Sequence, residues 1–330
     1  MRVFFKLVVL IFLGFAGWLA WALLMPLTPP RETFVLLPSG LPTRQIAEHL
    51  QASGVIRSRR AFLLLHYCQR RRTLKAGEYR FDAPENAAQV FGKLARGDIY
   101  THTVVIPEGY NIFEVAQAVQ QAGLGMAGDF LAATRTEAGL ARGFDPQATS
   151  LEGYLFPDTY QFTRTQSMHD MLQVMVRRFE QESRQIGLSE NVHAVVTMAS
   201  IVEKETAIAS ERPLVASVYY NRLQRRMPLG ADPTVAYAAL LNQRYRGAIY
   251  QSDLQFDSAY NTYKHGGLPP GPIANPGIAS LKAAMNPGRS DYLYFVADGQ
   301  GGHRFSSNFE EHTRNVAAWR LWQRDPRHAP

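Results

Sequence analysis

Hydrophobic residues form one continuous run near the N-terminus of the chain. No charged residue occurs from Leu7 through Met25, and a helix of this length measures about 28 Å, enough to span a bilayer. Trp18 and Trp21 lie toward its far end, where amphipathic rings favour the lipid headgroups. Three prolines then predict the end of the helix: Pro26, Pro29 and Pro30. The pattern predicts a transmembrane helix over residues 7–25, preceded by a cytoplasmic tail, residues 1–6.

A cleaved signal peptide is the alternative interpretation of this run. The segment Ala20-Trp21-Ala22 has the small-x-small form that signal peptidase prefers. The uncharged run is longer than the roughly 7 to 15 residues of a signal-peptide core, which favours a retained anchor. Charges on the two sides, Arg2 and Lys6 against Arg31 and Arg44, give only a slight positive-inside bias.

Beyond the anchor, one pattern of hydrophobic and polar positions occurs twice. Residues 34–55 align with residues 103–124 without a gap. Each copy has a run of aliphatic and β-branched residues, a Pro-x-Gly turn, and an amphipathic stretch that ends at glycine. The pattern predicts strand, turn and helix in both copies. The identical pairs are Val35/Val104, Pro38/Pro107, Gly40/Gly109, Ala47/Ala116, Gln51/Gln120 and Gly54/Gly123.

Between the two copies the pattern predicts one more helix and one more strand. Ala61–Leu65 is rich in apolar residues, and the sequence GEYRFD at 77–82 alternates as a strand does. The resulting β-α-α-β order over residues 31–102 is similar to a small LysM-like module, a fold that binds N-acetylglucosamine polymers. A purely structural spacer fits the pattern equally well, because a fold does not fix a function.

Longer amphipathic helices follow from about Asp129. Helices are predicted over 169–187, 191–206 and 210–223, the last with Ser210 as its N-cap. The sequence YLYFVADGQGGHRFSSN at 292–308 predicts two strands joined by a glycine-rich turn. Helices and strands are thus segregated, which predicts an α+β fold.

The predicted organisation is therefore an anchor followed by three soluble parts. A LysM-like module occupies 31–102, and a second, related strand-helix segment with a connection occupies 103–150. A larger mixed helix and strand domain, 151–330, is the predicted catalytic domain.

The composition narrows the range of expected binding partners but does not indicate in which cellular compartment the protein lies. The formal net charge is +7, and Arg70-Arg71-Arg72 forms a short basic run. No nucleic-acid motif or aromatic stacking pattern accompanies the run, so a solvated basic face is the preferred interpretation and nucleic acid is not an expected partner. The single cysteine, Cys68, allows no internal disulfide and fits both reducing and oxidising compartments.

Two glutamates near the end of a predicted helix are the first candidates for chemistry. Glu203 and Glu205 lie two positions apart, which is about 200° of helical rotation, so only one can point into a given cleft. They cannot form the two-carboxylate pair of a glycosidase. Taken alone, the segment fits two exposed helix-end charges beside Lys204, and periodicity does not choose between the glutamates.

Downstream loops rich in Gly, Pro, Asn and Tyr are typical of a sugar-binding groove. Together with the helices they form an ordered series of motifs along the chain: LEGYLFPDTY (151–160), ASIVEKET (199–206), ERPLVASVYYNRL (211–223), ADPTVAYA (231–238), AYNTY (259–263), GLPPGPIANPG (267–277), SLKAAMNP (280–287) and YLYFVADGQGGHRF (292–305). This series resembles the MltG (YceG-like) family of endolytic murein transglycosylases, and the resemblance covers nearly the whole chain.

The resemblance implies a membrane-anchored peptidoglycan lytic transglycosylase. Such an enzyme protonates the oxygen of a MurNAc-β-1,4-GlcNAc bond and then helps the C6 hydroxyl of MurNAc close onto C1 as a 1,6-anhydro end. The family's catalytic glutamate falls on Glu205, which would need a raised pKa; Met198 and Ile201, on its side of the helix, could supply an apolar setting. The candidate substrate contacts are Tyr260, Asn261, Tyr263, Asp232 and Thr234.

The same resemblance implies the compartment and the partners. The expected location is the cell inner membrane, crossed once, with the catalytic domain in the periplasm. The expected partners are nascent glycan strands, whose elongation the enzyme would terminate, the membrane itself, and cell-wall synthases. No cofactor is expected, and the spacing of Asp298, His303 and His312 matches no metal motif.

Two other functions stay open at this stage. The chain could be a non-catalytic glycan-binding scaffold for cell-wall synthases. It could also be a muramidase that uses water, with Asp232 or Asp257 as the second carboxylate.

Overall fold

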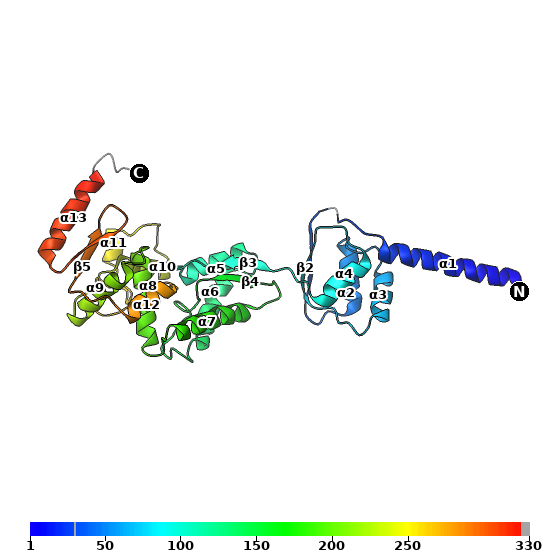
Figure 1. Ribbon diagram of the computed structural model, residues 1–330, viewed down its shortest axis with the longest axis horizontal. Coiled ribbons are helices and arrows are strands. Elements are labelled where there is room, and N and C mark those ends of the chain that lie inside the picture. Colours follow the sequence, from blue (N-terminus) through cyan, green and yellow to red (C-terminus); the bar gives the residue numbers. More distant parts are fainter. Residues whose placement is uncertain (30, 325–330) are drawn as a thin grey trace. The chain divides into compact units, whose positions relative to one another are not determined.

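The computed structural model describes residues 1–29 and 31–324, so Pro30 and residues 325–330 of the predicted catalytic domain lie outside the described part. The fold is mixed α+β, as predicted, and its described strands pair in three two-stranded sheets (Figure 1). The chain divides into two compact units. Unit 1 comprises residues 1–103, 122–124 and 161–167, and unit 2 comprises 104–121, 125–160 and 168–330.

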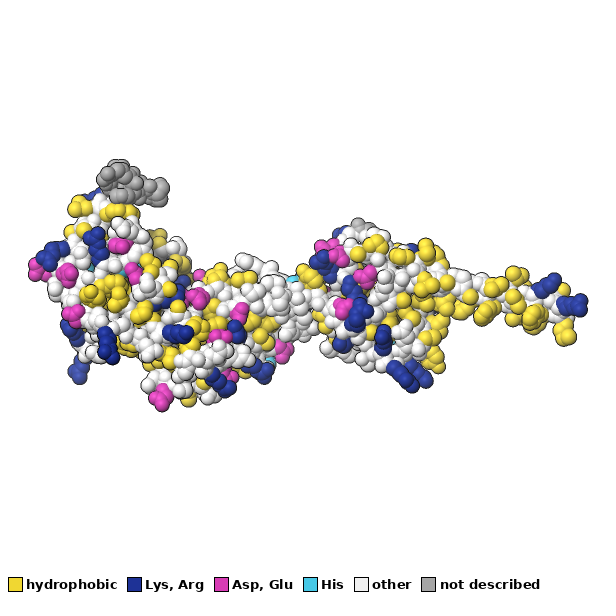
Figure 2. Space-filling model, viewed as in Figure 1, with side chains coloured by type: hydrophobic (Ala, Val, Ile, Leu, Met, Phe, Trp, Pro, Cys, Tyr) yellow, Lys and Arg dark blue, Asp and Glu magenta, His cyan; other side chains and the backbone are white. Residues whose placement is uncertain are grey.

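Helix α1, Arg2–Leu24, is the predicted N-terminal apolar helix. Its mean hydropathy is 2.5, and among the described helices it alone is long and apolar enough to cross a membrane; a signal sequence shares these properties. Figure 2 shows hydrophobic side chains along this helix and basic ones at its N-terminal end. The helix ends where Met25 adopts an extended conformation, as expected for a residue that precedes proline.

Unit 1 contains a small module in the predicted strand-helix-helix-strand order, followed by a further helix. The elements are β1 (Thr33–Leu37), α2 (Thr43–Ala52), α3 (Arg59–Cys68), β2 (Gly77–Phe81) and α4 (Ala87–Arg96). β1 and β2 pair antiparallel, with Val35 opposite Tyr79. The resemblance of this module to LysM domains remains a prediction.

The core of this module follows from the alternation of buried and exposed side chains along its strands. Val35 and Leu37 of β1 are buried on one face, where they join Leu50 of α2, Phe62 of α3 and Phe91 of α4. Each of these side chains is at most 3% exposed, and burying one large apolar side chain contributes roughly 1.5–3 kcal/mol. The packed face therefore holds the helices against the two strands.

The second copy of the repeated pattern has the same local structure as the first. It forms β3 (His102–Val105) and α5 (Ile112–Gln121). Gly40 and Gly109 in the two turns have φ angles of 80° and 79°, and Gly54 and Gly123 after the two helices both have φ of 70°. These angles lie in the left-handed region that favours glycine, which explains why the pattern places glycine at these positions.

The rest of the chain is mainly helical. Its elements in order are α6 (Ala127–Thr136), the 3₁₀ turn η1 (Ala138–Leu140), β4 (Thr159–Phe162), α7 (Met168–Gln185), α8 (Val192–Glu205), α9 (Arg212–Gln224), α10 (Asp232–Leu241), α11 (Gln251–Leu254), α12 (Ile278–Met285), β5 (Tyr294–Ala297), β6 (His303–Ser306) and α13 (Phe309–Arg324). β4 pairs with β3. The predicted C-terminal hairpin is present, with Tyr294 opposite Ser306 in antiparallel register.

Helix α8 is the central helix of unit 2. It contacts α9, α10 and α12, which surround it in Figure 1. Its residues from Val196 through Val202 are buried on all sides, so the helix is enclosed by its neighbours rather than lying on a surface. In its C-terminal turn, where the two glutamates lie, Lys204 is exposed and Glu205 is partly exposed.

The predicted N-cap of the following helix is wrong by one residue. α9 begins at Arg212, and its N-cap is Glu211 rather than Ser210. Pro213 occupies the first turn, where its fixed φ suits a helix start. Ser210 therefore precedes the helix.

A close backbone contact supports α8 from the LEGYLFPDTY motif. Gly153 has a φ of +88°, and a Cβ at this position would lie 2.5 Å from Cβ of Pro272 and 2.9 Å from Cγ1 of Val196 in α8. Both the backbone conformation and the available space therefore require glycine.

We expect Gly153→Ala to lower the free energy of unfolding by about 3 kcal/mol, because it combines left-handed strain with a steric clash. Gly187→Ala is the matched control: its φ is +78°, but no atom lies within 4 Å of the added Cβ. That control should lose only about 1 kcal/mol from strain. Denaturant unfolding of both variants measures the difference, and equal losses would show that close packing at Gly153 contributes nothing.

Candidate active site

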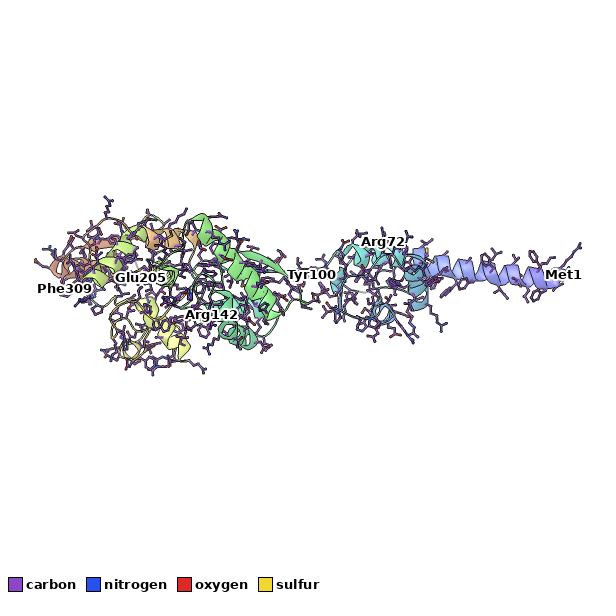
Figure 3. All side chains as sticks on the ribbon, turned by 90° about the horizontal axis from the view of Figure 1, so that it is seen from below. Met1, Arg72, Tyr100, Arg142, Glu205 and Phe309 are labelled. Atoms are coloured by element: carbon purple, nitrogen blue, oxygen red, sulfur yellow. The ribbon has the colours of Figure 1, made fainter. Side chains whose placement is uncertain are left out.

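Glu205 is the last residue of α8, at the point where the chain leaves the helix. Thr206 follows in an extended conformation. The Glu205 side chain is half-buried and opens into a cleft of about 540 Å³. Besides Glu205, the cleft is lined by Tyr219, Arg222, Met227–Gly230, Asp232, Tyr263, Tyr294, Phe295, Phe309 and His312. Two residues that line this cleft, Glu205 and Phe309, are labelled in Figure 3.

The Glu205 carboxyl group is held in one position by a tyrosine. The hydroxyl of Tyr219 in α9 donates a hydrogen bond to Oε1 of Glu205 at 2.5 Å. Burial raises the pKa of Tyr219 well above its ordinary value, so this hydroxyl keeps its proton and acts as a donor.

Burial also controls the protonation of Glu205. Desolvation raises the pKa of Glu205 from 4.5 to about 7, against the Tyr219 hydrogen bond, which lowers the pKa. The charge of Asp232 raises the pKa further, while His303 and Arg222 lower it. The result is a carboxyl group that carries its proton about half of the time at neutral pH.

Two of the five predicted substrate contacts line this cleft. Asp232 is the first residue of α10, and Oδ1 of Asp232 accepts a hydrogen bond from the Tyr263 hydroxyl at 2.6 Å. Tyr263 is 45% exposed, so much of its ring is accessible to a ligand. The structure thus brings Asp232 and Tyr263 to the same cavity as Glu205.

Asn261 and Thr234 have a different role from the one predicted. Both are completely buried. Nδ2 of Asn261 donates to the carbonyl groups of Leu254 and Phe256, and the Thr234 hydroxyl donates to the carbonyl of Ala231. Because these side chains are enclosed and hydrogen-bonded internally, we correct their predicted role from substrate contact to support of the AYNTY loop by Asn261 and of the start of α10 by Thr234.

Tyr260, the remaining predicted contact, is half-buried and does not line the Glu205 cleft. Its ring packs against Tyr237 with centroids 5.1 Å apart. The AYNTY loop therefore presents Tyr263 to the cleft, while Tyr260 packs against α10.

Sequence reasoning missed a group of cleft residues on α9 and after it. Arg222 donates through Nε to the Leu293 carbonyl at 2.7 Å and through Nη1 to the Leu229 carbonyl at 2.6 Å. It also lies over the ring of Tyr294 at 5.2 Å. Tyr219 and Arg222 are three residues apart, so a face-by-face inspection of α9 could have found them together.

His312 also borders the cleft and stacks on Tyr294 with ring centroids 4.9 Å apart. Burial lowers the pKa of His312. The sequence gives no signal that this histidine, one turn into α13, lies near Glu205.

Glu203 lies in a separate environment from Glu205, as the helical rotation predicts. Its Oε1 pairs with Arg212 at 2.9 Å, and its Oε2 accepts from the backbone N–H of Gly277 at 2.9 Å. The Glu203 and Arg212 side chains are only 5% and 9% exposed. Glu203 therefore joins α8 to α9 and to the start of α12 and does not line the cleft.

The other acidic and histidine residues weighed from the sequence have structural partners. Glu211 accepts from the backbone N–H of His303 and bonds to its ring, and Asp298 accepts from backbone groups of the hairpin turn. Asp257 is exposed, pairs with His265 and lies outside the lining of the Glu205 cleft. Within residues 1–29 and 31–324, no group of three or more His, Cys, Asp or Glu residues could hold a metal ion.

Comparisons with known proteins match the chain over most of its length. The sequence model described as the YceG-like family matches residues 35–318. A protein of Bacillus subtilis named endolytic murein transglycosylase is 33% identical, over 89% of this chain and 87% of that protein. A protein of the same name from Streptococcus pneumoniae is 31% identical over 89% of this chain, which spans 60% of that longer protein.

A solved structure is also similar. The crystal structure of a YceG-like protein from Listeria monocytogenes has a TM-score of 0.57 and 33% sequence identity. The alignment covers 86% of this chain and 99% of that chain.

We expect Tyr219→Phe to raise the pKa of Glu205 above about 7, because the lost hydrogen bond stabilises the charged carboxylate. A hydrogen bond to a charged group contributes roughly 1.5–3 kcal/mol, which corresponds to an increase of about one pKa unit or more. Carbon-13 NMR titration of the glutamate carboxyl groups measures the shift. Tyr220→Phe is the control, since Tyr220 donates to the Ala284 carbonyl instead; a shift in that variant would contradict the assignment.

We expect Glu203→Gln to destabilise the protein by about 3 kcal/mol, because it removes the closer carboxylate partner of the buried Arg212, at 2.9 Å, and leaves only Glu108, at 3.7 Å. Glu205→Gln should leave stability nearly unchanged, since an amide oxygen can still accept from Tyr219. Thermal unfolding at neutral pH compares the two variants. A stable Glu203→Gln protein would contradict the structural role of Glu203.

Proposed function

The chain belongs to the YceG-like family, and we propose that it is a peptidoglycan lytic transglycosylase whose catalytic acid and base is Glu205. The observation that carries the proposal is the Glu205 carboxyl group, which opens into the cleft with its pKa raised to about 7. A group with this pKa can donate a proton and later accept one at neutral pH. The names of the relatives from Bacillus and Streptococcus support the same reaction class.

In the first proposed step, protonated Glu205 donates its proton to the oxygen of a MurNAc-β-1,4-GlcNAc bond. The bond between C1 of MurNAc and that oxygen breaks, and GlcNAc leaves with a free C4 hydroxyl group. Positive charge develops on C1 and the ring oxygen of MurNAc. The nearby Asp232 carboxylate has the right sign to stabilise this charge.

In the second step the Glu205 carboxylate accepts the proton of the MurNAc C6 hydroxyl group. The C6 oxygen forms a bond to C1, which gives a 1,6-anhydroMurNAc end and restores the protonated carboxyl group. One carboxyl group suffices because the nucleophile belongs to the substrate itself. The Tyr219 hydrogen bond keeps this carboxyl group in one orientation through both steps.

A muramidase that uses water is the second candidate function. It is favoured by the presence of a second carboxylate, Asp232, in the same cleft. In that reaction Asp232 would activate a water molecule and the product would carry a reducing end. The two reactions therefore differ in the chemical nature of the new end.

We further propose that α1 anchors the enzyme in the cell inner membrane, with the rest of unit 1 and all of unit 2 in the periplasm. The length and hydropathy of α1 support the anchor. The β-α-α-β module would then bind N-acetylglucosamine residues in the manner of a LysM domain. Held near the membrane, the enzyme would cut nascent strands internally and so terminate their elongation, with synthases as neighbours.

We expect Glu205→Gln to abolish the release of 1,6-anhydro ends from nascent glycan strands, with a loss of activity of at least about a thousandfold. Purified full-length protein is incubated with strands made in vitro, and mass spectrometry identifies the ends. Wild-type activity should fall as the pH rises above about 7, because the first step needs the protonated form of Glu205.

Glu190→Gln is the control for this experiment, since Glu190 is an exposed glutamate outside the cleft. Reducing ends instead of anhydro ends would support the muramidase. Cleavage by Glu205→Gln at the wild-type rate would refute the role of Glu205, and no cleavage by any form would favour a non-catalytic scaffold.

A further inference from the structure

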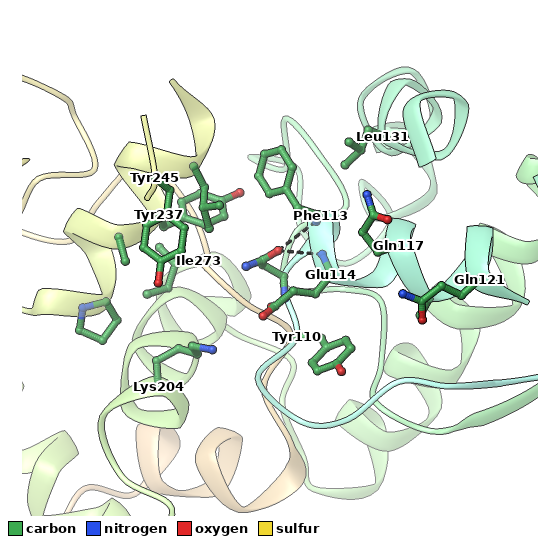
Figure 4. Close-up of a pocket in the computed structure, with 15 residues that line it drawn as sticks. Tyr110, Phe113, Glu114, Gln117, Gln121, Leu131, Lys204, Tyr237, Tyr245 and Ile273 are labelled. Atoms are coloured by element: carbon green, nitrogen blue, oxygen red, sulfur yellow. Dashed lines mark hydrogen bonds between the residues drawn. The ribbon is translucent and has the colours of Figure 1, made fainter. Parts of the chain in front are cut away.

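A second cavity lies on the other side of the C-terminal end of α8. Its volume is about 460 Å³, and we call it the aromatic groove. It is defined here by Tyr110, Phe113, Gln117, Lys204, Tyr237 and Tyr245. Figure 4 shows Tyr237 and Tyr245 on one side of the groove and Phe113 and Gln117 on the other.

Two helices form the walls of this groove. Phe113, Gln117 and Gln121 of α5 are four residues apart and so lie on one helical face. Pro233, Tyr237 and Leu240 of α10 present a second face at helical spacing. In Figure 4, Lys204 and Gln121 lie toward opposite ends of the groove.

The aromatic groove adjoins the Glu205 cleft along the backbone. Lys204 lines the groove and the next residue, Glu205, lines the cleft. In the same way Asp232 lines the cleft and the next residue, Pro233, lines the groove. Two pairs of consecutive residues on different helices thus separate the cavities, so the cleft and the groove are neighbours on unit 2.

The chemistry of the groove suits a carbohydrate. Tyr110, Phe113 and Tyr245 are partly or largely exposed and offer ring surface for the apolar faces of pyranose rings. The exposed amides of Gln117 and Gln121 can both donate and accept hydrogen bonds, as sugar hydroxyl and acetamido groups require. The ammonium group of Lys204 donates one hydrogen bond to the Gly109 carbonyl at 3.2 Å. An ammonium group has three N–H donors, so further donors can bind a ligand.

We propose that the aromatic groove binds the glycan strand beyond the bond that Glu205 attacks. The inference rests on the proposed function and deepens it, because a strand held on both sides of the cleaved bond is cut internally rather than at its end. The ligand class is a β-1,4-linked N-acetylated saccharide. Tyr245 and Gln117 are its binding residues on opposite walls of the groove.

The experiment compares strands of different length as substrates of the full-length protein. Tyr245→Ala and Gln117→Ala should each lower kcat/KM on long strands by about tenfold. They should leave the cleavage of strands too short to enter the groove unchanged. Both side chains are exposed, so truncation spares the folded core. Tyr250→Ala and Gln255→Ala are the matched controls, since neither lines the groove and both are exposed.

A binding measurement separates this proposal from the proposed function. The Glu205→Gln protein is titrated with an N-acetylglucosamine hexamer in a calorimeter, with and without Tyr245→Ala, and the loss of Tyr245 should weaken binding about tenfold. A free peptidoglycan stem peptide is the comparison ligand. Unchanged length preference and hexamer affinity, or peptide binding that depends on Tyr245, would overturn the groove assignment. Cleavage by the Glu205→Gln protein would instead overturn the proposed function.

Discussion

Burial of the Glu205 carboxyl group at the end of α8 is the interaction on which the site depends. A solvent-exposed carboxyl group cannot donate a proton at neutral pH, because it has already lost that proton. Here desolvation raises the pKa of Glu205 to about 7 and the Tyr219 hydrogen bond limits that rise. The neighbouring helices therefore set the protonation of this group through the environment they enclose, and α9 contributes by carrying Tyr219 into hydrogen-bonding distance.

The rest of unit 2 keeps that helix end in place. The Glu203–Arg212 pair and the backbone N–H of Gly277 connect α8 to α9 and to the start of α12. Buried Asn261, in the AYNTY loop, and buried Thr234, in the first turn of α10, hold the segments that present Tyr263 and Asp232. A buried network of ion pairs and hydrogen bonds favours one conformation over others, since a group that lost its partner would carry a large desolvation penalty. The groups that face the cleft are few, and many more support them.

Much of this architecture could be predicted from local sequence. Periodicity located the apolar N-terminal helix, the repeated strand-turn-helix unit and the C-terminal hairpin, because each depends on near neighbours in the chain. The rotation between Glu203 and Glu205 was also predictable from helix geometry. Periodicity could not decide which glutamate faces the cleft, since that depends on Arg212 and Tyr219 in the next helix. Asn261 and Thr234 were predicted as ligand contacts from the resemblance and their polar side chains, and only tertiary packing shows that both are buried. Arg222 and His312 come from segments that converge only in the folded chain.

The last turn of α8 limits how the length of this helix can vary. Three consecutive residues there serve three different surroundings: Glu203 pairs with Arg212, Lys204 lines the aromatic groove and Glu205 lines the cleft. Each added residue turns a helix by about 100°. One insertion or deletion between the packed core of α8 and this turn would place the wrong side chain in each of the three surroundings at once. The register of α8 relative to α9 and α10 is therefore fixed.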